Sequence, residues 1–153
     1  MTQTPSSLVA HQAAARVAVP ANFAFEKLAN AGFVGGWALG SMGLQAVADG
    51  VFRGQSLFDG SSAHVEIRPH PDQGLIDFHV GTAQSRKPRI FIRITDGAGL
   101  GFDSGACLVT MHALRANDAA EDTWARTCVS HEAEILLIKS QLESAWAAAR
   151  GRA

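Results

Sequence analysis

Residues 121–149 read EDTWARTCVSHEAEILLIKSQLESAWAAA and decide the fold of this chain. No glycine or proline interrupts the segment before Gly151, and apolar side chains recur every three or four positions, which predicts one long amphipathic helix. Successive helical residues are turned by about 100°, so one stripe of this helix should face a core. The stripe contains Trp124, His131, Ile135, Ile138, Leu142 and Trp146, with Cys128 and Ala145 on its flanks.

Short strands separated by turns precede this helix. The pairs Asp49-Gly50 and Asp59-Gly60 are typical of hairpins, because tight turns require residues that accept a positive φ. The sequence therefore predicts a single α+β domain over residues 11–150, after a flexible N-terminus of residues 1–10. We expect strands at 11–19, 43–48, 51–58, 62–68, 75–80, 88–95 and 106–114, and short helices or bends at 21–31 and 32–37.

Alternation along these strands assigns the two faces of the predicted sheet. One parity is apolar and should meet the long helix, and the other is charged and should face solvent. The apolar positions are Ala63, Val65, Ile67, Ile76, Phe78, Val80, Ile90, Ile92 and Ile94. The charged positions are His64, Glu66, Arg68, Asp77, His79, Arg89 and Arg93. We interpret the charged set as solvated cross-strand pairs such as Arg68–Asp77 and Glu66–His79, an assignment that a register shift of one residue would reverse.

The composition argues against several classes of partner. The chain has 153 residues, 47% of them apolar, and a net charge of −1. That is enough chain to bury a core, and it leaves no basic excess for nucleic acid. No apolar stretch is long enough to span a bilayer, and no signal peptide is evident. Cys107 and Cys128 lack metal-site spacing, so we expect a cytoplasmic protein without a metal or cofactor.

Several segments, taken in this order, carry a resemblance to a known superfamily. They are RVAVPANFAFEKLAN (16–30), the bend to Trp37, VFRGQSLFDG (51–60), AHVEIRPHPDQGLIDFHVG (63–81) and HEAEILLIKSQLESAW (131–146). Together they resemble the helix-grip fold of the START and Bet v 1-like superfamily, also called SRPBCC or polyketide cyclase/dehydrase-like. The resemblance implies a curved seven-stranded antiparallel sheet wrapped around the C-terminal helix, two short helices closing one end, and an apolar cavity. Members carry or transform lipids, sterols, polyketides and plant hormones, and some act as co-chaperones.

His131 and Glu134 are the candidate catalytic residues. A histidine in the middle of an apolar stripe must form a hydrogen bond or bear a desolvation cost. In the functional interpretation His131 faces the cavity and binds, or exchanges a proton with, a ligand oxygen, while Glu134 one turn later orients the ring or acts as the acid/base. In the structural interpretation, which is the commoner one for a lone histidine, His131 bonds a strand carbonyl or Thr110 and positions the helix.

The aromatic and aliphatic side chains of the apolar faces either line a pocket or fill a core. Our candidate ligand-binding residues are Trp37, Phe52, Phe58, Phe78, Ile92, Trp124, Cys128, His131, Ile135 and Leu142. The loop Gly97–Gly105 is a candidate flap at the cavity entrance. Leu136 and Leu137, on the outer side of the helix, are candidates for a homodimer contact or for contact with the N-terminal residues.

Three functions fit these patterns, and we favour the first. It is binding of a small apolar molecule, such as a lipid, polyketide or aromatic compound, between sheet and helix. The second is a polyketide cyclase/dehydrase-type enzyme that uses His131 and Glu134. The third is a protein-interaction module with a filled core. Binding is favoured because only one or two polar groups project inward, whereas an enzyme usually needs a convergent set.

Overall fold

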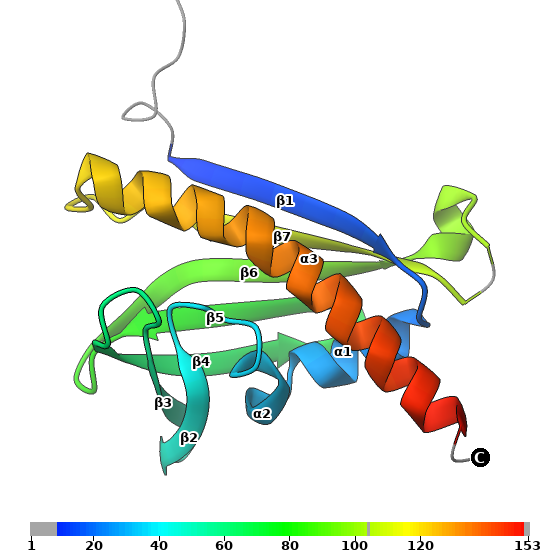
Figure 1. Ribbon diagram of the computed structural model, residues 1–153, viewed down its shortest axis with the longest axis horizontal. Helices are drawn as coiled ribbons and strands as arrows, with labels where there is room; N and C mark the ends of the chain where they lie inside the picture. Colours follow the sequence, from blue (N-terminus) through cyan, green and yellow to red (C-terminus); the bar gives the residue numbers. More distant parts are fainter. Residues whose placement is uncertain (1–8, 104, 152–153) are drawn as a thin grey trace, which may run out of the picture.

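The computed structural model describes residues 9–103 and 105–151 and shows a curved antiparallel sheet crossed by one long helix (Figure 1). The predicted flexible N-terminus lies outside the described residues, apart from Val9 and Ala10. The sheet has seven strands in the order β1-β7-β6-β5-β4-β3-β2. The strands are β1 (Ala10–Val17), β2 (Met42–Ala48), β3 (Val51–Gln55), β4 (Ser62–His70), β5 (Leu75–Gly81), β6 (Arg86–Asp96) and β7 (Cys107–Leu114). The helices are α1 (Ala21–Leu28), α2 (Ala31–Val34) and α3 (Glu121–Gly151), with short turns of 3-10 helix at η2 (Pro71–Gln73) and η3 (Gly97–Leu100).

Helix α3 follows the predicted stripe closely. Its buried side chains are Trp124, His131, Glu134, Ile135, Ile138 and Leu142. The amphipathic pattern therefore predicted the packed face, except that Glu134 is buried rather than on the edge of the stripe. Trp146, near the end of the stripe, is half-buried, and its ring meets Phe23 of α1 at 4.9 Å between centroids.

The core fills the space between the middle of the sheet and the C-terminal half of α3. Its fully buried side chains come from α1, from the segment after α2, from the central strands and from α3; they include Leu28, Trp37, Ile76, Ile92, Val109, Met111, Ile138 and Leu142. Each such side chain contributes roughly 1.5–3 kcal/mol relative to exposure to water. This part of the interior is packed.

Helix α3 packs beside β1, which is the edge strand at that end of the sheet (Figure 1). The Ala18 N–H donates to Glu143 Oε2 at 2.8 Å, and Lys139 Nζ donates to the Arg16 carbonyl at 3.0 Å. Lys139 and Glu143 also pair with each other at 2.6 Å. Main-chain groups at the end of an edge strand, which would otherwise need water, are thereby satisfied by the helix.

Two sequence-based expectations about local structure were wrong. The strand expected at 51–58 ends at Gln55, because the main chain closes a turn in which Ser56 N–H bonds the Ser61 carbonyl at 2.8 Å. Phe58 therefore sits in a turn with 43% of its surface exposed. The loop Gly97–Gly105 follows the C-terminal end of β6 and carries η3, whereas the cavity between α3 and the sheet lies by the N-terminal end of that strand, so the described residues of this loop form no flap over that cavity.

Candidate functional site

A cavity of about 480 Å³ lies between the N-terminal half of α3 and the adjoining end of the sheet. Its wall is built from residues 38–41, the turn after β3, the end of β5, the start of β6, the end of β7 and α3. Apolar wall is supplied by Val80, Ile90 and Trp124 among others. The inner end carries His131 and Glu134, which are 3% and 5% exposed. Charged and hydroxyl side chains, among them Asp59, Arg89 and Arg126, complete the wall, which is therefore mixed, with two deeply buried titratable groups.

The predicted ligand-binding residues divide between this cavity and the packed core. Phe58, Trp124 and His131 line the cavity, as does the catalytic candidate Glu134. Trp37, Phe78, Ile92, Ile135 and Leu142 belong to the core cluster, and Phe52 packs against it. Cys128 is half-buried on α3, outside the cavity wall that the described residues form. The sequence identified the apolar faces, but it did not show which part of them stays unfilled.

His131 and Glu134 lie one helical turn apart, and their atoms Nε2 and Oε1 are 3.7 Å apart. Glu134 is held from the other side by the Leu39 N–H, which donates to Oε2 at 2.9 Å. His131 Nδ1 has no hydrogen-bond partner among the described residues, and the ring meets His11 of β1 edge-on, with 6.3 Å between centroids. No bond joins His131 to Thr110 or to a strand carbonyl within residues 9–103 and 105–151. The structural role expected for it is therefore not the one observed.

Burial shifts the pKa values of His131 and Glu134 in opposite directions. Loss of hydration, with a smaller effect of nearby His11, lowers the pKa of His131 to about 4. Loss of hydration raises the pKa of Glu134 to about 7, against the opposing effect of the Leu39 N–H. Between these values the pair is a neutral imidazole beside a carboxylic acid, with no salt bridge. Such a carboxyl group can give or take a proton near neutral pH.

Arg89 is a cavity residue that the sequence analysis assigned to the wrong face. Phe78 of β5 stands opposite Ile90 of β6, but the next residue, His79, stands opposite Pro88. Arg89 is therefore the extra residue of a β-bulge, which breaks the alternation and re-aims the side chain. It lines the cavity next to Ile90 rather than sharing the outer face with Arg93. Pro88 was the available signal, because proline inside a central strand is typical of a bulge.

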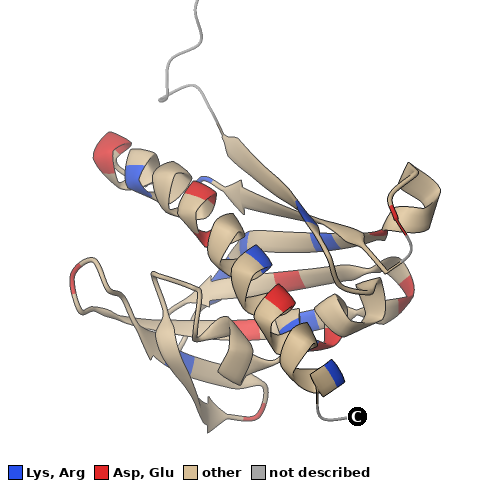
Figure 2. Ribbon diagram, turned by 45° about the vertical axis from the view of Figure 1, so that its right-hand side comes forward, with Lys and Arg blue, Asp and Glu red and all other residues tan. Residues whose placement is uncertain are grey.

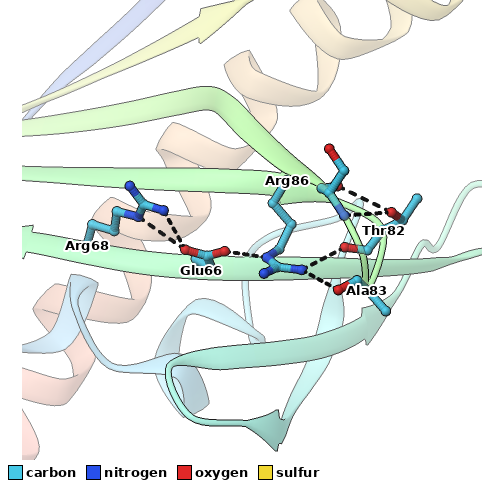
Figure 3. A network of polar contacts seen from close by, with 6 residues as sticks. Glu66, Arg68, Thr82, Ala83 and Arg86 are labelled. Atoms are coloured by element: carbon cyan, nitrogen blue, oxygen red, sulfur yellow. Dashed lines mark hydrogen bonds and ion pairs between the residues drawn. The ribbon is translucent and has the colours of Figure 1, made fainter.

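The charged residues of the outer face form the solvated network that alternation predicts, although with different partners (Figure 3). Glu66 stands opposite His79, and Arg68 opposite Asp77, as expected. The ion pairs, however, join Glu66 to Arg68 at 2.7 Å and to Arg86. Hydrogen bonds from these two arginines hold the pKa of Glu66 below its ordinary value.

Arg86 also ties this network to the β5–β6 hairpin. Its guanidinium donates to the carbonyls of Thr82 and Ala83 at 2.9 and 2.7 Å. The arrangement fastens the hairpin to β4 and needs no ligand to explain it. Among residues 9–103 and 105–151, no group of three or more His, Cys, Asp and Glu side chains could hold a metal ion.

The charged residues of the described chain are distributed over its elements. Lys and Arg are interspersed with Asp and Glu over sheet and helix in Figure 2, in keeping with the net charge of −1. None of the helices in the described part of the chain is both long and apolar enough to cross a membrane.

Several solved structures share this architecture. The Zhui aromatase/cyclase from a Streptomyces species matches 88% of this chain and 93% of its own at 12% identity and a TM-score of 0.62. A START superfamily protein from Mycobacterium smegmatis matches 88% and 99% at 11% identity and a TM-score of 0.60. The Aha1 dimer from Colwellia psychrerythraea matches 89% and 97% at 10% identity and a TM-score of 0.64.

Sequence comparison adds nothing to these matches: no protein-family model fits the chain, and no curated protein is similar to it. Identities of 10–12% over nearly the whole length establish a shared fold and leave the activity open. The chain therefore has an SRPBCC/START-like helix-grip fold.

Proposed function

We propose that this protein binds a small, mainly apolar ligand in the cavity beside the N-terminal half of α3. The observation that carries the proposal is the cavity itself: about 480 Å³, next to a core that is otherwise packed. That volume is in the range of small-molecule sites, which combine apolar walls with a few polar groups. The neighbours described as START and aromatase/cyclase proteins support a fold that handles such ligands.

An acid/base enzyme is the second candidate, and the state of Glu134 favours it. A carboxyl group with a pKa of about 7 in a cavity wall, 3.7 Å from a neutral imidazole, is suited to proton transfer. Mass spectrometry of ligand that co-purifies with the wild type and with Glu134→Gln separates the candidates. A different ligand mass in the variant indicates an accumulated substrate, whereas the same ligand in both indicates a carrier.

An interaction module with a filled core has less support. Leu136 is 63% exposed on α3 and could serve a homodimer contact, but Leu137 packs partly against the core. The apolar patch expected from the two residues is thus reduced to one of them.

Because Cys107 and Cys128 are both free, we place the protein in a reducing compartment, the cytoplasm.

Filling the cavity from α3 tests the binding function. Thr127 lines the cavity and is half-buried, whereas Ala133 is exposed on the same helix. Thr127→Phe should abolish the fluorescence rise of the neutral dye Nile red and remove any small molecule seen by native mass spectrometry. Ala133→Phe should leave both signals unchanged. A wild-type protein that binds neither Nile red nor a co-purifying molecule would contradict the proposal, as would equal binding by the two variants.

A further inference from the structure

Arg89 is a half-buried cation of the cavity wall that has no acidic partner among the described residues. Its guanidinium donates one hydrogen bond, to the Pro88 carbonyl at 3.1 Å, and forms no ion pair within the described residues. An arginine side chain has five N–H donors, so most of its capacity is unused. The side chain is half-buried, and the bulge in β6 aims it at the cavity.

Arg126, the other arginine of the cavity wall, is already engaged. Its guanidinium lies 4.6 Å from the centre of the Phe58 ring. Arg126 is also exposed, whereas Arg89 is half-buried. The partly desolvated cation of the cavity wall is therefore Arg89.

The acidic residue at the inner end does not neutralise Arg89. Glu134 is nine-tenths or more buried and accepts a hydrogen bond from the Leu39 N–H. Its pKa is raised to about 7, so it is protonated below that pH. The cavity thus offers apolar wall formed by Val80, Ile90 and Trp124 together with one half-buried cation, Arg89, that has no counter-ion within residues 9–103 and 105–151.

From this arrangement we infer that the ligand is an amphipathic monoanion, a carboxylate whose head group pairs with Arg89 while its apolar body lies along the cavity wall. The inference rests on the proposed binding function and names its ligand class. A guanidinium binds a carboxylate through two parallel N–H···O bonds. One unpaired guanidinium balances one negative charge, which favours a carboxylate over a doubly charged phosphate.

Isothermal titration calorimetry with octanoate, octanol and octyl phosphate tests this at about pH 6, where Glu134 keeps its proton and octanoate is ionised. The wild type should bind octanoate about tenfold more tightly than octanol, the size of one charge-assisted hydrogen bond at a half-exposed site. Arg89→Gln should bind the two equally. Arg93→Gln, on the same strand but on the outer face, should keep the preference. Arg89→Lys retains the positive charge but not the two parallel donors, and should keep only part of the preference.

The outcomes separate the two proposals. Binding of octanol without preference for octanoate leaves the binding function standing and overturns the assignment to Arg89. The same holds if Arg89→Gln weakens both ligands alike, or if Arg93→Gln loses the preference as fully as Arg89→Gln. Tighter binding of octyl phosphate than of octanoate overturns the carboxylate. Failure of all three ligands to bind the wild type contradicts the binding function as well.

Discussion

At the scale of single residues, His131 and Glu134 make opposite contributions to the pH dependence of folding. Glu134 has a raised pKa in the folded state, so its contribution to stability is present below pH 4.5 and is lost as the pH rises through about 7. His131 has a lowered pKa, so its contribution is present above 6.5 and is lost as the pH falls through about 4. Between about 4.5 and 6.5 the two dependences oppose each other and largely cancel.

Single substitutions should reveal the hidden dependences. In Glu134→Gln only the histidine remains, so the free energy of unfolding should increase as the pH rises from about 4 to 6.5, by about 2–3 kcal/mol. In His131→Asn only the glutamate remains, and the free energy should decrease by a similar amount as the pH rises from about 4.5 to 7. Urea unfolding across this range provides the measurement.

Glu26→Gln is the control for these variants, because Glu26 is exposed on α1. It should reproduce the wild-type profile. Slopes of the same sign in the Glu134 and His131 variants would show that the two groups do not titrate as opposed, buried residues.

At the scale of elements, the edge of the sheet depends on a side chain of α3. Glu143 accepts hydrogen bonds from Lys139 and from the Ala18 N–H, and both hold its pKa below the ordinary value. Because Glu143 is partly exposed, the contacts are worth about 1 kcal/mol. Glu143→Ala should lower the free energy of unfolding by that amount and accelerate hydrogen exchange at the Ala18 amide. Glu132→Ala, at a more exposed site on the same helix, should not change hydrogen exchange at the Ala18 amide. If Glu132→Ala accelerates that exchange as much as Glu143→Ala does, the bond from Ala18 to Glu143 is not responsible.

The elements also show what could be predicted from the sequence. Helix α3 was predicted to run over 121–149 and ends at Gly151, because its pattern is long and uninterrupted. The charged parity of β4 and β5 was also correct. The end of β3 and the bulge at Arg89 were missed, since each is set by the local closure of one strand against another. The missed features are the ones that place Phe58 and Arg89 in the cavity wall.

At the scale of the whole molecule, α3 divides the interior into two parts. Its C-terminal half, with Ile138 and Leu142, closes a packed core, and its N-terminal half, with Trp124 and Thr127, covers the cavity. A sequence pattern cannot distinguish the two, because apolar residues recur with the same spacing on both. The core cluster contains Trp37 and Phe78, whose rings meet edge-on with 6.4 Å between centroids, and neither residue lines the cavity.

This division predicts that stability and binding can be altered separately. Leu142→Ala removes a fully buried side chain from the packed core and should lower the free energy of unfolding by about 2–5 kcal/mol. It should change the affinity for Nile red less than about twofold, a difference near 0.4 kcal/mol, since Leu142 lies outside the cavity wall. Thr127→Phe should do the reverse. Urea unfolding and dye titration on both variants provide the measurements. If Leu142→Ala also abolishes binding at urea concentrations well below its unfolding transition, the core and the cavity act as one unit. The core then has to be counted as part of the binding site.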